Sequence, residues 1–361
     1  MKAKFYLIAA AACAALAARS KNEVAPVDVD QEITFQAVVN KASTKAMIDG
    51  NLYATDAPSF GTAAYYNATG TVFPSSSSLY IPESEVNYNN TDKGWTTETP
   101  YYWPKNGALT FFSYSPWSIN ASTTIDETNG IVITNYNVDE NQEKDVMVAD
   151  VVTANSNDTE YQSTTYKKGV NTVFRHKLAQ IVDVTFRTDK NYKLSPIAAG
   201  HKVFFINHVK LNNYKQTGTY TSTINVSSTN LGAWTDHSNP KSYIFYEETT
   251  PCGKEFVYDN TNAGTSAKSI TNGYLLLLPQ TFADLDTKFE IKYTIRTYSS
   301  NENYSDDVVT VEIPLYNIIA SHKIEMNKKY TFKFTVGLDQ IYWAPSVVAW
   351  DSETFDYTPT I

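Results

Sequence analysis

The sequence is poor in cysteine and in long apolar runs, and each shortage excludes a class of structure. Its 361 residues include only two cysteines, Cys13 and Cys252. Because Cys13 lies in an N-terminal segment that we expect to be removed, no disulfide framework is expected, and packing must stabilise the fold. No window approaches the roughly 18 consecutive apolar residues that a membrane-spanning helix needs. We therefore expect a mature chain that is soluble or attached to a surface.

The sequence also has no excess of positively charged residues. The formal net charge is −9 and the pI is near 5.1. Binding of nucleic acid requires clustered lysine and arginine side chains that displace counterions from the phosphates. No basic stripe occurs along the sequence, so we expect no nucleic-acid partner.

Motifs for catalysis and for metal or cofactor binding are absent as well. No G-x-S-x-G elbow, P-loop or dinucleotide glycine pattern occurs, and the acidic run at residues 139–145 lacks the spacing of a calcium loop. A reactive thiol at Cys252, or a pair of facing carboxylates in a carbohydrate-active enzyme, stays open as a weaker alternative. We expect no enzymatic activity, no metal and no cofactor. The histidines show no metal-ligand spacing; they are His176, His201, His208, His237 and His322.

The first residues have the features of an export signal. Two lysines precede an apolar stretch over residues 5–12, and residues 16–18 read Leu-Ala-Ala. A lipoprotein leader ends in this way directly before a cysteine, but the next residue here is Arg19, which has no thiol to accept a lipid. Residues 1–18 are therefore predicted to be a signal peptide of near-lipoprotein type. Either a substitution has removed a lipid anchor, or ordinary signal peptidase cuts among the small residues.

What the sequence does contain is β-forming residues. There are 26 Tyr, 17 Phe and 6 Trp against 4 Met, a composition typical of β-structure with polar loops. Alternation supports this interpretation. Within the segment at residues 101–118, Leu109 and Phe111 are predicted to share one face of a strand, with Phe112 and Tyr114 on the other.

The strand pattern continues beyond a junction that we place near residue 175. Val182, Val184 and Phe186 are predicted to share one face of a strand. Short strands separated by turns, without a long amphipathic helix, indicate an all-β fold of two consecutive β-sandwich domains with long loops. We assign the N-terminal sandwich to residues 46–175 and the C-terminal sandwich to residues 176–361.

A lone strand precedes these domains. Ile33, Phe35, Ala37 and Val39 alternate on one side of it, after a charged tether at residues 20–31. We assign residues 19–45 to a propeptide that contains this tether and strand. A strand held to the body only by a flexible loop can fill a groove between sheets until the loop is cut.

Several segments together resemble one protein family. They are the leader, the lone strand, "STKAM" at 43–47, "YYWPKNGALTFFSYSP" at 101–116, "FRHKLAQIVDVTF" at 174–186, and "NKKYTFKFTVGL" at 327–338 followed by "VVAW". The chain resembles the fimbrillin or Mfa-like proteins, the type V pilins of Bacteroidales-like anaerobes. The resemblance implies transthyretin-like, Greek-key sandwiches, export to the outer membrane surface, and a fimbrium that supports adhesion or biofilm formation.

The same resemblance implies two processing features. In this family a trypsin-like protease cuts after a basic residue beyond the first strand, and Lys45-Ala46 stands at the matching place. Lysine keeps the positive charge of the usual arginine but not its planar fork, so the protease stays unidentified. The replacement strand would come from the C-terminal segment of another pilin subunit, in a head-to-tail homopolymer. Its alternating apolar residues are Val347, Ala349, Phe355, Tyr357 and Ile361.

Two alternatives stay open. The C-terminal segment can instead be the last strand of its own domain. The chain can also be a tip or stand-alone adhesin that binds host glycans or proteins through aromatic clusters such as residues 101–103 and 342–343, although such clusters more commonly pack in a core or at a strand rim.

Overall fold

The computed structural model describes most of the chain, in twelve ranges of residues. The signal peptide, Arg19, Cys252 and the predicted donor residues Phe355, Tyr357 and Ile361 lie outside them. Of Val39, Lys45 and Ala46 only the backbone is described. The described ranges are 31–40, 45–47, 59–69, 77–89, 94–138, 145–156, 169–224, 230–248, 253–256, 268–270, 274–338 and 341–350.

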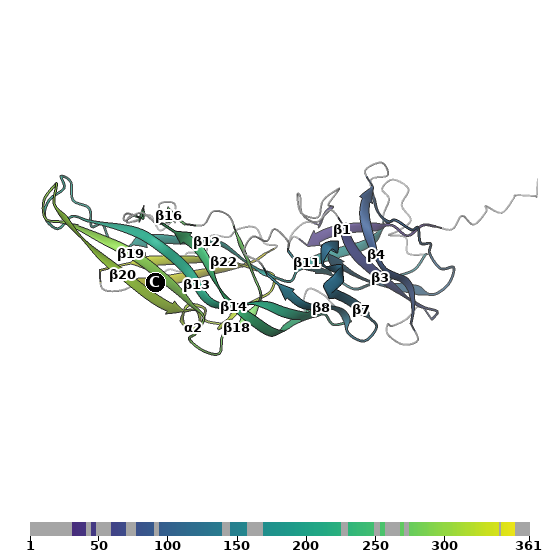
Figure 1. Cartoon of the computed structure of the whole chain (residues 1–361). Helices are drawn as coiled ribbons and strands as arrows, with labels where there is room; N and C mark the ends of the chain where they lie inside the picture. Colours follow the sequence, from purple (N-terminus) through teal and green to yellow (C-terminus); the bar gives the residue numbers. More distant parts are fainter. Residues whose placement is uncertain are drawn as a thin grey trace, which may run out of the picture.

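The described chain is all-β, as predicted. Its only helices in these ranges are a 3-10 turn η1 (Trp117–Ser122) and a single turn α2 (Leu315–Ile318). Neither has the length and apolar character needed to cross a membrane. Figure 1 shows an elongated molecule, with the N-terminal strands gathered at the right and the long C-terminal strands extending to the left.

The N-terminal strands form a nine-stranded sheet. Its order is β10-β6-β3-β4-β5-β1-β11-β9, with β2 paired to β1. Because β6 also pairs with β9, the seven strands from β6 through β1 to β9 close into a ring. The bounds are β1 (Phe35–Asn40), β2 (Lys45–Met47), β3 (Ser59–Asn67), β4 (Ser78–Asn89), β5 (Gly94–Thr97), β6 (Ala108–Ser115), β9 (Met147–Ala149), β10 (Val152–Ala154) and β11 (Val170–His176).

Strand β6 shows how the alternation of side chains builds this region. All of its residues are buried, because both of its faces are covered. Leu109 and Phe111 contribute to the core enclosed by the ring, whereas Phe112 and Tyr114 belong to a second core that includes residues of the C-terminal half. The two faces predicted for this strand are therefore confirmed.

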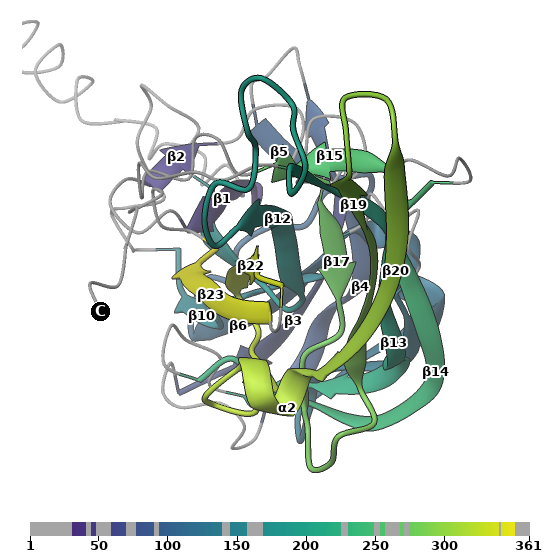
Figure 2. The ribbon, with the colours of Figure 1, turned by 90° about the vertical axis from the view of Figure 1, so that its left-hand side faces the viewer.

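The C-terminal strands form two facing sheets and one small pair (Figure 2). One sheet has the order β16-β12-β22-β23, with β17 paired to β12. The facing sheet has the order β20-β19-β13-β8-β7, with β14 and β15 paired to β13, and β18 pairs with β21. The bounds are β7 (Thr123–Asp126), β8 (Gly130–Asn137), β12 (Ala179–Thr188), β13 (Lys202–Thr221), β14 (Ala233–Glu247), β15 (Lys254–Phe256), β16 (Lys268–Ser269), β17 (Leu275–Leu277), β18 (Gln280–Thr281), β19 (Lys288–Tyr298), β20 (Tyr304–Pro314), β21 (Lys323–Ile324), β22 (Lys328–Val336) and β23 (Ile341–Ala349).

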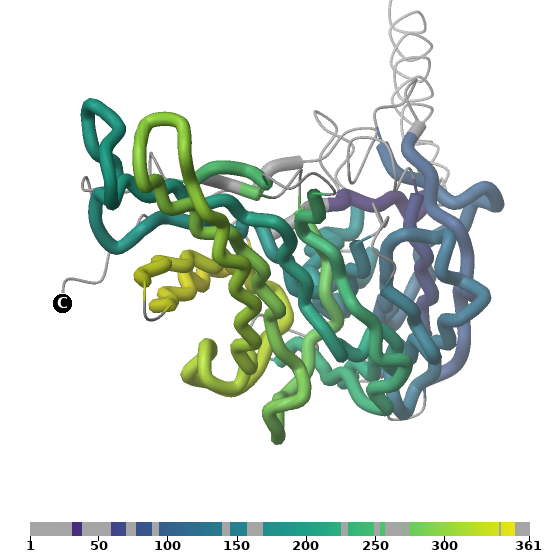
Figure 3. The backbone as a smooth tube through the Cα atoms, turned by 60° about the vertical axis from the view of Figure 1, so that its left-hand side comes forward, coloured from purple at the N-terminus to yellow at the C-terminus, as the bar shows by residue number. Residues whose placement is uncertain are grey.

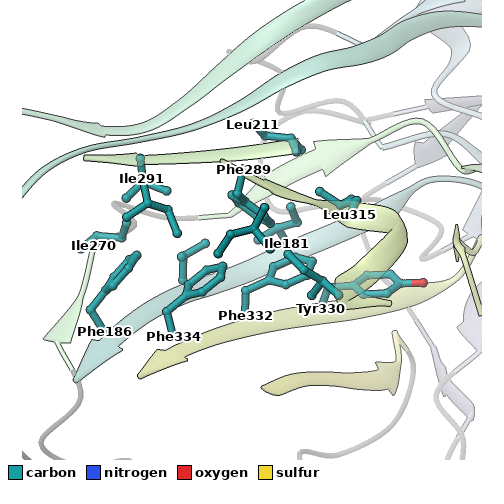
Figure 4. Packing of buried hydrophobic residues seen from close by; sticks show 14 of the residues in the cluster. Ile181, Phe186, Leu211, Ile270, Phe289, Ile291, Leu315, Tyr330, Phe332 and Phe334 are labelled. Carbon is teal, nitrogen blue, oxygen red and sulfur yellow. The ribbon is translucent and has the colours of Figure 1, made fainter. Parts of the chain in front are cut away.

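Aromatic side chains join the two facing sheets. The ring of Phe289 on β19 lies 5.0 Å from the ring of Phe332 and 5.4 Å from that of Phe334, both on β22, measured between centroids (Figure 4). Edge-to-face pairs at this separation stabilise a core beyond the burial of their area. These contacts hold β19 over β22 and leave β20 and β23 at the borders of their sheets.

The face predicted for β12 is partly wrong. Val184 and Phe186 are buried as expected, but Val182 is exposed. The register of β12 against β22 shifts between Ile181 and Asp183. This bulge places an extra residue in β12 and turns Val182 away from the core, which period-two alternation cannot anticipate.

The two halves of the chain share a sheet. The hairpin β7–β8 comes before residue 175, yet β8 pairs with β13 of the C-terminal half. Figure 3 shows the purple-to-blue and the green-to-yellow parts of the backbone meeting at this teal middle section. The expected pair of consecutive Greek-key sandwiches is not confirmed by this topology.

Candidate functional site

The predicted N-terminal strand is an internal strand of the ring (Figure 1). β1 runs parallel to β11 over five register pairs, from Phe35 opposite Val170 to Val39 opposite Phe174. On its other side it pairs with β5 at Phe35 and Trp95. We call the gap between β5 and β11 that β1 fills the β1 seat.

The backbone of the aromatic cluster at 101–103 borders the entrance to this seat. The Ile33 N–H donates to the carbonyl of Tyr101 at 2.8 Å, and the Trp103 N–H donates to the carbonyl of Gln31 at 2.9 Å. Trp103 is buried in the ring core, whereas Tyr102 is exposed. The cluster therefore helps to hold the chain that leads into β1.

The side chains of β1 and of Ile33, just before it, complete the ring core. Ile33 and Phe35 are each 1% exposed and Ala37 is 0% exposed. The ring of Phe35 packs edge-on against the rings of Phe60 and Phe111, at 5.8 Å in both cases. Full burial contributes about 1.5–3 kcal/mol for each large apolar side chain. Ile33 and Phe35 together thus favour the seated strand by roughly 3–6 kcal/mol before ordering costs.

A glycine permits the close approach of β1 to β11. A Cβ atom added at Gly169 would lie 2.2 Å from the backbone nitrogen of Phe35. The next residue, Val170, donates its N–H to the carbonyl of Thr34 at 2.7 Å. Any strand that occupies the β1 seat with this spacing therefore needs a residue without a side chain at position 169.

The predicted cleavage site lies in strand β2, directly beside β1. In the antiparallel register Lys45 is opposite Asn40 and Ala46 is opposite Val39. The Lys45–Ala46 peptide bond is thus in extended backbone that pairs with the strand whose removal was predicted.

The described part of the predicted donor segment is strand β23. Val347 lies opposite Tyr330 and Ala349 opposite Lys328 of β22. Val347 is 42% exposed, although residues opposite each other in an antiparallel pair share a face and Tyr330 is buried. In this structure Val347 and Ala349 therefore form part of the last strand of their own sheet, the first of the alternatives left open by the sequence.

Two border strands of the C-terminal sheets, β23 and β20, each carry a feature that hinders pairing with another strand. β23 contains Pro345, which removes a backbone donor. β20 has the exposed Asp307 opposite the buried Ile295, which places a charged side chain on the border strand. Proline and charged side chains are known protections of sheet edges.

Three consecutive basic side chains are buried at the end of β11 and directly after it. Arg175 forms a bidentate pair with Asp150, with Nε–Oδ1 and Nη2–Oδ2 distances of 2.6 and 2.7 Å, and the Nδ1 of His176 hydrogen-bonds the Asp145 carboxylate. The Lys177 Nζ donates to the carbonyl of Leu231 at 3.1 Å. Burial lowers the pKa of Lys177 to about 7, against the smaller opposing effect of the Asp150 charge.

Sequence reasoning missed two parts of this arrangement. Gly169 stands directly before a β-branched run, and this position could have indicated a close backbone approach. The contact of His176 with Trp350, at ring centroids 4.1 Å apart, joins distant segments and gives no local signal. Among the described residues, no group of three or more His, Cys, Asp or Glu could hold a metal ion.

These features define an all-β protein whose N-terminal strand completes a ring and is followed by a basic residue in extended backbone. The family model described as fimbrillin-like matches residues 44–350. The chain therefore belongs to the fimbrillin-like family, which confirms the predicted resemblance.

One solved structure agrees with this chain at the level of the fold. The structure of a fimbrial protein from Bacteroides vulgatus aligns with a TM-score of 0.60 at 17% identity, covering 89% of this chain and 100% of that chain. A fimbrial assembly protein from Parabacteroides distasonis aligns with a TM-score of 0.38 at 10% identity, covering 89% and 99%. No match was found among curated proteins.

Proposed function

We propose that this protein is a structural subunit of a cell-surface fimbria that is activated by proteolysis and polymerised by strand exchange. In this proposal residues 1–18 are a signal peptide and residues 19–45 are removed by a trypsin-like protease that cuts after Lys45. The β1 seat then receives a strand from the C-terminal segment of another copy. The product is a head-to-tail homopolymer at the outer membrane surface.

The position of β1 inside the ring carries this proposal. If β1 leaves, β5 and β11 lose their shared neighbour, and the ring core loses Ile33, Phe35 and Ala37. An opened seat presents apolar surface and unpaired backbone groups, which favour the addition of a strand. Pro345 and Asp307 disfavour the same reaction at β23 and β20, so the opened seat is favoured over these two borders.

Family membership supports the same interpretation. The protein from Bacteroides vulgatus is described as fimbrial and that from Parabacteroides distasonis as a fimbrial assembly protein. Association with other pilin subunits at the cell surface follows for a member of such a family. The family is one of structural and adhesion proteins, which supports a role without catalysis.

Limited proteolysis of the purified precursor tests the proposal. Digestion with a trypsin-like protease is expected to produce a new N-terminus at Ala46 and a ladder of SDS-resistant oligomers. Lys45→Ala should abolish both, whereas Lys41→Ala, which changes a neighbouring lysine, should abolish neither. Deletion of residues 351–361 leaves β23 in place and should permit cleavage but prevent the ladder. A trimmed protein that stays monomeric would contradict strand exchange.

A tip or stand-alone adhesin is the second candidate. Tyr342 is 50% exposed and Trp343 is 39% exposed on opposite faces of β23, and each presents aromatic surface to a glycan or a host protein. A tip subunit needs a β1 seat but no detachable C-terminal strand. If the deletion of residues 351–361 leaves assembly intact while Tyr342→Ala and Trp343→Ala abolish host-cell binding, the adhesin is the better description.

A further inference from the structure

The chain leaves β23 through an aromatic contact with the other half of the molecule. Trp350 directly follows β23, and its ring stacks on the ring of His176 with centroids 4.1 Å apart and planes 13° from parallel. Its backbone N–H donates to the carbonyl of Asn327 at 3.0 Å, just before β22. Trp350 is thus attached both to its own sheet and to the end of β11.

His176, the residue on which Trp350 stacks, is buried and hydrogen-bonded. His176 is 2% exposed and hydrogen-bonds the carboxylate of the buried Asp145. Asn327 in turn donates its N–H to the carbonyl of Leu178 at 3.0 Å. The segment that joins β11 to β12 therefore supports Trp350 from two sides, through a ring and through a backbone bond.

Without such support, β23 would be poorly placed to resist tension at its C-terminal end. It is a border strand, joined to β22 by nine antiparallel register pairs that begin with Ala349 opposite Lys328. A pull on the residue after Ala349 would load these pairs one after another and peel the strand away. Trp350 stands at the point where peeling would begin.

We propose that the stack of Trp350 on His176 is a mechanical anchor that transfers tension from the C-terminal tail into β11. The inference rests on the proposed function, because tension on the tail arises when a second copy holds it. β11 is also a wall of the β1 seat, where five parallel register pairs hold the seated strand. A strand pulled along its axis in that register loads several pairs together. The seat, β11, His176, Trp350 and the tail thus form one continuous path for tension from subunit to subunit.

Hydrogen exchange of the monomeric precursor tests the anchor without any polymer. In Trp350→Ala, the amides of residues 347–349 are expected to exchange at least tenfold faster than in the parent protein, while the amides of 332–334 in β22 stay protected. Trp343→Ala removes an indole from the same strand but not from this stack, and should leave residues 347–349 unchanged. His176→Ala should reproduce the effect of Trp350→Ala, and the double variant should add little, because both remove the same contact.

Single-molecule pulling measures the mechanical role directly. Handles at the C-terminus and at Asn171→Cys in β11, in a Cys252→Ser background of the chain from residue 19 onward, apply force along the proposed path. Trp350→Ala should add a low-force step that releases the nine residues of β23, about 30 Å of extended chain. The parent protein and Trp343→Ala should show no such step before the main unfolding event.

Further variants keep the test decisive. Trp350→Phe retains a ring that can stack, and should shift the low-force step back toward the parent behaviour even if the alanine variant folds poorly. Identical traces for the parent protein, Trp350→Phe and either alanine variant at the stack would overturn the anchor. Because the precursor is measured as a monomer, a failure of polymerisation after cleavage would contradict the proposed function and leave the anchor standing.

Discussion

The N-terminal ring and the C-terminal facing sheets solve the problem of sheet edges in different ways. In the ring, seven strands close on themselves, and β1 is one of them. The C-terminal sheets stay open, and two of their border strands carry Pro345 in β23 and Asp307 in β20. A closed ring has no exposed edge only while every strand is present. A proline or a charged side chain protects a border strand whether or not another strand is lost. Loss of a single strand would therefore open the ring, whereas the C-terminal borders would keep their protection.

Expulsion of β1 is the largest effect that this comparison predicts. Phe35→Asp would place a carboxylate against the rings of Phe60 and Phe111, which is costlier than leaving the seat. The loss is limited by the docking free energy of the strand, roughly 3–6 kcal/mol from its two large side chains. Hydrogen exchange should show β5 and β11 exposed while β19 and β22 stay protected. Gln36→Asp, on the half-buried face of the same strand, serves as the control; equal loss of protection in both halves would contradict independent behaviour of the ring.

The next largest effect concerns Lys177, at the junction between the two regions. Its contribution to folding stability depends on pH. Burial lowers the pKa of Lys177 to about 7 from 10.5. The unfolded chain therefore binds this proton up to a higher pH than the folded chain, and folding stability should rise with pH from about 7 toward 10. The gain between pH 7 and 9 is about 2–3 kcal/mol.

Lys177→Met should remove this gain. Urea denaturation at pH 7 and pH 9 measures the free energy of unfolding, and the variant should be more stable than the parent at pH 7. Lys333→Met, which replaces an exposed lysine of β22, should keep the pH dependence of the parent. An undiminished gain in Lys177→Met would show that another group titrates in this range.

A smaller effect is expected from the fit between β1 and β11. Gly169→Ala places a Cβ atom 2.2 Å from the Phe35 backbone, so one strand must shift, at a cost of about 1–3 kcal/mol. Thermal or urea denaturation measures the loss of stability, and exchange at β1 amides should show where it arises. Gly200→Ala is a control in open space, although its positive φ adds some strain. A harmless Gly169→Ala would mean that the seat tolerates a wider spacing than the structure has.

The smallest effect on stability should come from the C-terminal border. Asp307→Val removes the charge that faces Ile295 at the edge of β20 and should change the free energy of unfolding by less than about 0.5 kcal/mol. It should nevertheless increase self-association in the uncleaved precursor, as sedimentation velocity can show, because the edge loses its protection. Thr310→Val, which introduces the same side chain on the other face of β20, is the control. Unchanged association in Asp307→Val would mean that the edge is protected by other means.

The alternation of apolar and polar residues along the sequence predicted which side chains of several strands are buried. The alternation in β6 and in β1 is a direct consequence of side-chain period, and Leu109, Phe111, Ile33 and Phe35 are buried as expected. Strand β14 has no such apolar alternation, because its sequence is polar and mostly exposed. It forms through pairing with β13, with several shifts of register that no period describes.

In the candidate site, too, some features could be predicted from the sequence and others could not. Its apolar residues could be predicted from the sequence, but neither Gly169 nor the stack of His176 on Trp350 could, since both depend on contacts between distant segments. The strand predicted for the propeptide could be placed only as a lone strand from the sequence, because alternation carries no information about neighbouring strands.

By itself the sequence determined that this protein is built of strands and which side chains of β1 face a core. Aromatic and β-branched residues at period two suffice for that, because a pleated strand sends alternate side chains to opposite faces. Only the tertiary structure decided that β1 is internal, parallel to β11 and beside Lys45, and that the chain leaves β23 stacked on the end of β11. Strand order and direction are set by the packing of segments far apart in the chain, where the free energy of burial decides between pairings that local pattern leaves equal.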